Sequence, residues 1–339
     1  MTDRSYTPKK QILLTGAGFS KPFGGYLASE MWAAIFNKVN TDRTHNVRTL
    51  LRGELNYEAA YDSVMSGPFS AAEKEAFSIA LVEAYGALDR SIQSRMGGSP
   101  PLKHALRAFI TQFKGEENQR GFIFTLNQDL LLERFFHYSD APFQIPAPGQ
   151  HPDWFTSRMD RNTQFEANMP LPARLQKFQE QFWRRSLGLS DFVYVKLHGS
   201  YGWRSSTNNN AMVIGHNKSG DIAKEPLLKW YLAFFQEVLN YGDQILVVAG
   251  YGFMDEHING IIADAAKTNL QLHMVSPMQP KDLESHLWSR SSKAGGKPVP
   301  RGQEIWQMLS GYHCTSAEQI FAQNADALRE DFLNSVGLS

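Results

Sequence analysis

The chain has 339 residues, and its 34 lysines and arginines are balanced by 34 aspartates and glutamates to a formal net charge of +0. Because it lacks the basic surplus of proteins that hold nucleic acid by its phosphates, we expect no direct binding to nucleic acid. A single cysteine, Cys314, excludes an internal disulfide and a zinc site built from several thiolates, and favours a cytoplasmic location. No apolar run reaches the roughly 20 residues of a membrane span, and the start lacks the apolar core of a signal peptide, so we expect no membrane association.

Five short apolar runs that end in glycine or polar residues predict strands. Runs without strict alternation are typical of parallel strands that helices cover on both faces. The predicted strands are Gln11–Thr15, Gly121–Thr125, Phe192–Leu197, Gln244–Ala249 and Gln271–Val275.

Helices are predicted where apolar residues recur at three- and four-residue steps. Ser70 and Glu73 form a capping-box pattern, and apolar residues from Phe77 to Ile92 follow it at helical spacing. Further helices are expected over residues 102–113, 171–182 and 226–238, and a last helix over residues 316–332. Strands that alternate with helices indicate an α/β fold with a doubly wound parallel sheet.

The spacing of these elements suggests how the chain is organised. We expect one domain over residues 1–277, interrupted by a helical insertion or subdomain near 46–115 and a second excursion near 135–190. Residues 278–339 are expected to form a C-terminal helical extension packed on the same domain. Polar stretches predict a loop or hairpin over residues 205–220 and a surface loop over residues 289–302.

The first of four motifs is Gly16-Ala17-Gly18-Phe19-Ser20, directly after a predicted strand. Its glycines would let the backbone approach a ligand, and a helix N-terminus behind them would offer N–H groups to a pyrophosphate. Lys21 stands where the common dinucleotide fingerprint has its third glycine. A tight turn without a ligand therefore explains the motif equally well.

The second and third motifs also follow strands, where ligands bind in open α/β sheets. Asn127 can fix a ribose hydroxyl or a water, and Asp129 can orient that amide, although Asp129 can instead simply cap a helix that starts near Leu130. His198, in the sequence KLHGS, can act as a general base near neutral pH. The chain has ten histidines, however, and a lone histidine is more often structural.

The fourth motif is GYGFMDEHIN over residues 250–259, which leads from a strand into a predicted helix. The plain explanation of Asp255 is that it caps this helix, with Glu256 favoured by the helix dipole. His257 is a weaker candidate for a ligand contact.

Together, GAGFS at 16–20, TLNQD at 125–129, KLHGS at 196–200 and GYGFMDEHIN at 250–259 resemble the sirtuin superfamily, and more closely the bacterial sirtuin-like proteins associated with phage defence. The resemblance extends from Gln11 to Pro277 and implies a Rossmann-like core that binds NAD⁺ across its strand ends. It implies catalytic roles for Asn127, Asp129 and His198. Contacts with NAD⁺ are implied for Gly16, Ala17, Gly18, Ser20, Gly250, Asp255 and Ser276.

Two departures indicate the branch. Protein-deacylating sirtuins generally carry a zinc ribbon of two cysteine pairs, which one cysteine cannot build, so we expect no metal. Their usual Gly-Ile-Pro-Asp-Phe-Arg segment is replaced here by Lys21-Pro22-Phe23-Gly24-Gly25-Tyr26. The resemblance therefore implies a zinc-less NAD⁺ glycohydrolase, with NAD⁺ as its substrate, that acts in antiviral defence.

An unregulated enzyme of this kind would deplete the NAD⁺ of its own host. By analogy with the defence group, we expect control by homo-oligomerisation or by a partner, such as an ATPase of HerA type. Two alternatives stay open: a module that senses NAD⁺ or ADP-ribose without catalysis, and, with less support, a zinc-less protein deacylase. Asn127 and His198 together favour chemistry, because nucleotide binding alone needs neither.

Overall fold

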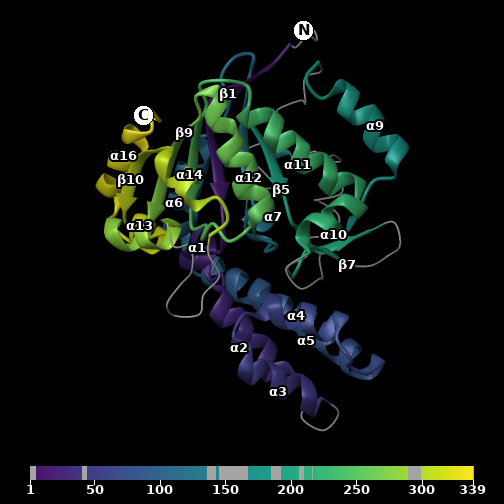
Figure 1. The fold of residues 1–339 in the computed structure, drawn as a ribbon. Coiled ribbons are helices and arrows are strands. Elements are labelled where there is room, and N and C mark those ends of the chain that lie inside the picture. Colours follow the sequence, from purple (N-terminus) through teal and green to yellow (C-terminus); the bar gives the residue numbers. More distant parts are fainter. Residues whose placement is uncertain are drawn as a thin grey trace.

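The computed structural model describes residues 5–39, 44–135, 143–144, 167–184, 192–205, 210–215, 217–288 and 299–338. Its centre is a seven-stranded sheet with the order β10-β9-β8-β1-β2-β5-β3, in which neighbouring strands pair in parallel (Figure 1). The strands are β1 (Thr7–Thr15), β2 (Gln119–Thr125), β3 (Phe143–Gln144), β5 (Phe192–Lys196), β8 (Ile245–Ala249), β9 (Gln271–Ser276) and β10 (Leu309–Cys314).

The five predicted strands are confirmed as β1, β2, β5, β8 and β9, although β1 begins four residues earlier than expected, at Thr7 rather than Gln11. From β1 the chain adds β2 and β5 on one side, and it then crosses to add β8, β9 and β10 on the other. The strand order thus reverses between β1 and β8. Ligands of doubly wound sheets bind at the carboxyl ends of the strands at such a point.

Apolar side chains cover the sheet, as the unbroken apolar runs predict. Ile12, Leu13 and Leu14 of β1 are fully buried. On β2, Phe122 and Phe124 pack against aromatic rings of α11 (Pro226–Leu239). Helices α6 (Pro100–Thr111) and α16 (Asp326–Ser335) meet through a stacked pair of phenylalanines. The confirmed fold class is therefore α/β and Rossmann-like.

Apart from α6, helices between β1 and β2 extend beyond the carboxyl end of the sheet (Figure 1). Here α5 is the predicted helix with a capping box, in which Ser70 and Glu73 satisfy each other's backbone N–H groups. The helices of this region are α1 (Ala17–Ser20), the 3-10 helix η1 (Lys21–Phe23), α2 (Ala28–Lys38), α3 (His45–Gly53), α4 (Tyr57–Ser66) and α5 (Ala71–Gly97).

The C-terminal part corrects two predictions. Residues 278–339 are not only a helical extension, because β10 adds a strand to the sheet beside β9. The single last helix is instead two, α15 (Ala317–Ile320) and α16. The six residues of β10, LSGYHC, include a single aliphatic side chain, so they give no clear strand pattern. Helices α13 (Pro280–Trp288) and α14 (Gly302–Gln307) precede it.

Residues 205–220 include part of a hairpin, in which β6 (Gly199–Arg204) pairs with β7 (Asn210–Met212). Most of the excursion near 135–190 and of the loop over 289–302 lies outside the described residues. The remaining elements are β4 (Ala167–Asn168), α7 (Leu131–Phe135), α9 (Pro172–Gln181), α10 (Lys218–Lys224), α12 (Glu256–Asp264) and the 3-10 helix η2 (Ala265–Thr268). Among the helices of the described residues, none is both long and apolar enough to cross a membrane.

Candidate active site

The turns that follow β1 and β8 pack backbone against backbone. The N–H of Gly16 donates to the carbonyl of Ala249, and that of Gly18 donates to the carbonyl of Gly250, both at 3.0 Å. A Cβ atom at Gly250, whose φ is +70°, would lie 2.1 Å from the backbone nitrogen of Phe19. Close packing of the two turns thus explains the glycines. It also uses the N–H groups of Gly16 and Gly18, which are consequently not free for the expected pyrophosphate.

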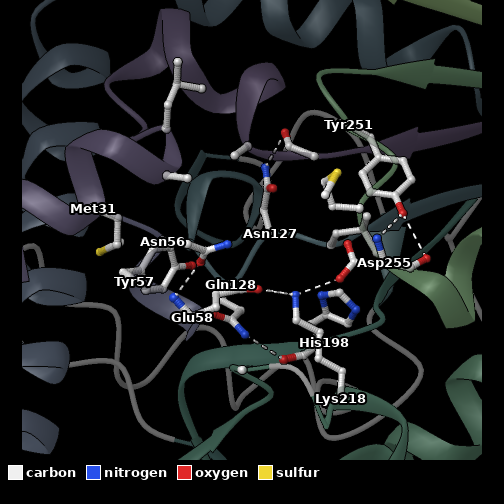
Figure 2. A pocket seen from close by; sticks show the side chains of 18 of the residues that line it. Met31, Asn56, Tyr57, Glu58, Asn127, Gln128, His198, Lys218, Tyr251 and Asp255 are labelled. Carbon is white, nitrogen blue, oxygen red and sulfur yellow. Dashed lines mark hydrogen bonds and ion pairs between the residues drawn. The ribbon is translucent and has the colours of Figure 1, made fainter. Parts of the chain in front are cut away.

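A cavity of about 500 Å³ opens at these strand ends, a size typical of sites for small molecules and cofactors. The strand ends form part of its wall, and Asn56, Tyr57 and Glu58, at the start of α4, form another part (Figure 2). The predicted site residues that line it are Gly16, Ala17, Asn127, Asp129, His198, Gly250 and Asp255. Gly18, Ser20 and Ser276 do not line it, and the Ser276 hydroxyl instead accepts from the Met278 N–H at 3.3 Å.

Asn127 is held by the group of residues that we call the Asn127 network: Gly16, Ser20, Asn127 and Asp129. The Nδ2 amide of Asn127 donates to the Gly16 carbonyl and to the Ser20 hydroxyl, both at 2.9 Å. Ser20 in turn donates to Oδ2 of Asp129 at 2.7 Å. Asp129 is therefore connected to Asn127 through Ser20. Because both amide protons are donated inside the protein, the atom that Asn127 can offer to a ligand is its oxygen Oδ1.

Asp129 makes contacts that correspond to both alternatives that the sequence left open. Its Oδ1 accepts from the Leu131 N–H at 3.0 Å, at the start of α7, while its Oδ2 accepts from Ser20. The Asp129 carbonyl also accepts from Nζ of Lys196, which forms a fully buried ion pair with Glu133 at 2.6 Å. The contact between Asp129 and Lys196 thereby connects the second motif with the third.

His198 follows β5 and faces a second histidine. Its Nε2 lies 2.9 Å from Nε2 of His257, which comes from the first turn of α12. Burial lowers the pKa of His198 to about 3, although the Asp255 carboxylate acts in the opposite direction. Burial likewise lowers the pKa of His257 to about 4. Both imidazoles are therefore neutral near pH 7.

An ammonium group lies beside the two histidines. Nζ of Lys218 contacts a carboxylate oxygen of Glu58 at 2.9 Å and Oδ1 of Asp255 at 2.7 Å (Figure 2). Burial alone would lower the pKa of Lys218, but the two carboxylates raise it above its ordinary value. Burial alone would raise the pKa of Asp255, but His198 and Lys218 hold it below its ordinary value. We call Glu58, His198, Lys218, Asp255 and His257 the Lys218 cluster.

Asp255 corrects the plain interpretation of the fourth motif. It stands at the N-cap position of α12, yet its side chain accepts no capping hydrogen bond. Its carboxylate contacts Lys218 instead. Together with His198 and His257 it offers metal-ligand atoms that lie within 4.8 Å of one another. A metal ion there would have to compete with the ammonium group of Lys218 for the carboxylate.

The sequence did not single out three residues of the site. Gln128 lies within the second motif, and its Nε2 donates to the carbonyls of His198 at 3.2 Å and Val213 at 2.7 Å. Its position between Asn127 and Asp129 was a usable signal. Glu58 and Lys218 had none, because nothing in a single sequence brings α4 and α10 together.

The family model of the SIR2-like domain matches residues 121–293, slightly more than half of the chain. No curated protein matches the chain. SIR2-like domains bind NAD⁺ and are in general NAD-dependent enzymes. The matched range contains the second, third and fourth motifs, which line one cavity at the switch point of a Rossmann-like sheet. The chain belongs to the family of SIR2-like domains.

Proposed function

We propose that the protein is a NAD⁺ glycohydrolase, which converts NAD⁺ and water to nicotinamide and ADP-ribose. The observation that carries this proposal is the placement of Asn127 and His198 in one cavity, after the neighbouring strands β2 and β5. At that place a hydrogen-bond acceptor can orient the attacking water, and a neutral imidazole can accept its proton.

In this reaction the bond between C1′ of the ribose and the nicotinamide nitrogen breaks, and nicotinamide leaves with the electron pair as a neutral molecule. The oxygen of water bonds to C1′ and gives up a proton. Asn127 orients that water, or a ribose hydroxyl, through Oδ1. His198 accepts the proton at Nε2, and general-base assistance of this kind contributes about 10²–10⁴-fold to a rate.

The charges around His198 support an orientation of NAD⁺ in which the nicotinamide end lies near the Lys218 cluster. With both histidines neutral, the Lys218 cluster contains two carboxylates and one ammonium group, so negative charge is in excess. Such surroundings favour the cationic nicotinamide ring and disfavour the pyrophosphate. We therefore place the nicotinamide end of NAD⁺ near the cluster.

The test is incubation of the purified protein with NAD⁺, with chromatographic measurement of nicotinamide and ADP-ribose. We expect His198→Ala to lower turnover by about 10²–10⁴-fold, and Asn127→Ala to lower it at least as much, because both water and ribose lose their orientation. His104→Ala, on the exposed surface of α6, is the matched control and should retain wild-type turnover. Thermal melts by circular dichroism distinguish lost chemistry from lost folding.

Retention of wild-type turnover by His198→Ala would refute the role given to His198. If NAD⁺ bound, as measured by calorimetry, but no nicotinamide was released in any assembly state, the protein would be a sensor of NAD⁺ instead.

We further propose that the activity serves antiviral defence and is controlled by assembly, either with itself or with a partner such as a HerA-type ATPase. This proposal rests on the motifs shared with the defence-associated branch. Light scattering combined with the NAD⁺ assay tests it, because a monomer with full activity at micromolar concentration would contradict control by assembly.

A further inference from the structure

The contact between His198 and His257 requires a defined placement of protons. Two imidazole nitrogens lie 2.9 Å apart, a distance at which one of them must carry a hydrogen and the other a lone pair. Both rings are neutral near pH 7, so each carries a single proton. The pair therefore has one donor, and which histidine donates decides what His198 can do.

The surroundings of His198 indicate the donor. The backbone of Leu126 acts to raise the pKa of His198, as a carbonyl oxygen near the ring does. Because Nε2 faces His257, such an acceptor favours the tautomer of neutral His198 that carries its proton on Nδ1. Nε2 of His198 is then the lone pair, and Nε2–H of His257 is the donor.

We propose that His257 is a positioning residue for His198: it donates Nε2–H to Nε2 of His198 in the free protein and gives up that nitrogen to the substrate hydroxyl during turnover. The inference rests on the proposed function for its catalytic part. His257 thereby keeps the lone pair of a nearly fully buried imidazole at the surface of the cavity, and prevents the ring from taking the other tautomer.

The position of His257 is fixed from two directions. On α12, the Asp255 N–H donates to the Tyr251 hydroxyl at 3.1 Å, and that hydroxyl donates to Oδ1 of Asn259 at 2.9 Å. From the other side, Lys218 connects Asp255 to Glu58 on α4. The first turn of α12 is therefore held both by its own loop and by the helical insertion, which is what a positioning residue needs.

The proton transfer is balanced by the groups present. As the hydroxyl or water displaces His257, its O–H bond breaks, an N–H bond forms at Nε2 of His198, and the electron pair stays on the oxygen that attacks or is stabilised. The resulting imidazolium lies near the Asp255 carboxylate, whose charge favours protonated His198. Nδ1 keeps its proton throughout, so no further rearrangement is required.

The first test is ¹⁵N NMR of the histidine side chains in the free protein, which reports protonation of each ring nitrogen without any turnover. Signals are assigned by their loss in His198→Ala and His257→Leu. We expect Nε2 of His198 to be unprotonated and Nε2 of His257 to be protonated. A protonated Nε2 on His198 would overturn the proposal, whether or not the protein hydrolyses NAD⁺.

The second test compares two variants of His257. His257→Gln places an N–H donor as many bonds from Cβ as Nε2 of histidine, whereas His257→Leu fills the space without a donor. We expect His257→Leu to lower kcat about tenfold with little change in KM, since the lost contact orients the base, and His257→Gln to recover most of the loss. Equal losses in the two variants, or an unchanged kcat in His257→Leu, would overturn the proposal. Absence of nicotinamide release by the wild type in any assembly state would instead refute the proposed function and leave the NMR result to decide the proton arrangement.

Discussion

The Asn127 network and the Lys218 cluster belong to one cavity but are built differently. The Asn127 network comes from the ends of the adjacent strands β1 and β2, and its contacts are short hydrogen bonds between backbone and small side chains. The Lys218 cluster is assembled from α4, β5, α10 and α12, and ion pairs and an imidazole pair hold it together.

This difference indicates what positions the side chains in each part of the site. Below the Asn127 network, the hydroxyls of Thr15 and Thr125 join β1 and β2 at 2.8 Å, and Thr125 also accepts from the Asn127 N–H at 3.0 Å. The strand register therefore sets the position of Asn127. The Lys218 cluster has no such register, and its geometry depends on ion pairs between separate helices. We expect the first region to be sensitive to hydrogen-bond geometry, and the second to charge and pH.

The largest effect is expected from Asn127→Asp, which keeps the shape of the side chain but removes both N–H donors. A carboxylate oxygen would then face the Gly16 carbonyl, two acceptors in contact, and the side chain would turn away. We expect turnover of NAD⁺ to fall by about 10²–10⁴-fold, as for Asn127→Ala, because a small displacement of an orienting group is costly. Steady-state kinetics measure this loss.

The matched control is Asn37→Asp on the exposed surface of α2, which introduces the same charge away from the cavity. It should keep wild-type turnover. If Asn127→Asp also kept it, the hydrogen bonds to Gly16 and Ser20 would not be what positions Asn127, and the contrast between the two regions would fail.

The same contrast explains how far the sequence predicts the structure. Strand runs such as Gln244–Ala249 are buried on both faces and carry an unambiguous apolar signal, so the central sheet was predictable. Strand β10 was not predicted because it is only half-buried and lies at the edge of the sheet, where no apolar run is needed. The short α15 was merged with α16 because their apolar residues share helical spacing across the break.

Residues of the Asn127 network were predictable because they belong to two motifs that follow strands, and parallel strands bring such motifs to one edge. Glu58 and Lys218 stand on helices, with no pattern that pairs them. The sequence marks His257 only as a weaker candidate for a ligand contact, because its contact with His198 depends on how the chain passes from β8 into α12. Charge pairing between distant helices is a tertiary property that one sequence does not encode locally.

The second prediction concerns Lys218→Met, which removes the ammonium group between two carboxylates. Loss of the ammonium group leaves the carboxylates of Glu58 and Asp255 close together without the cation that both contact, and such changes are strongly destabilising when the group is buried. We expect the free energy of unfolding to fall by about 3 kcal/mol, at the lower end for buried pairs because Glu58 is partly exposed. Urea unfolding followed by circular dichroism measures it.

Lys224→Met, on the same helix, is the control, since Lys224 forms an exposed ion pair with Asp221 and should cost less than about 1 kcal/mol. The double variant Lys218→Met with Asp255→Asn should recover part of the lost stability, because it removes one of the two negative charges that repel each other. A double variant no more stable than Lys218→Met would show that packing, and not charge balance, holds the cluster.

The smallest predicted effect is the pH dependence of stability, which distinguishes the imidazoles of the Lys218 cluster from the Asn127 network. His198 has a folded pKa of about 3, below the usual value near 6.5 that it regains on unfolding. Between these values the unfolded chain binds a proton that the folded protein does not, so stability is complete above about pH 6.5 and is lost as the pH falls towards 3. At about 1.4 kcal/mol per pH unit, the free energy of unfolding of the wild type should fall by about 2 kcal/mol more between pH 7 and pH 5 than that of His198→Gln.

The control is Asn127→Ala, which leaves the imidazole of His198 in place and should follow the wild type over the same interval. Parallel curves for the wild type and His198→Gln would mean that His198 has the same pKa in the folded and unfolded protein. The division between a network set by register and a cluster set by charge would then no longer hold at this residue.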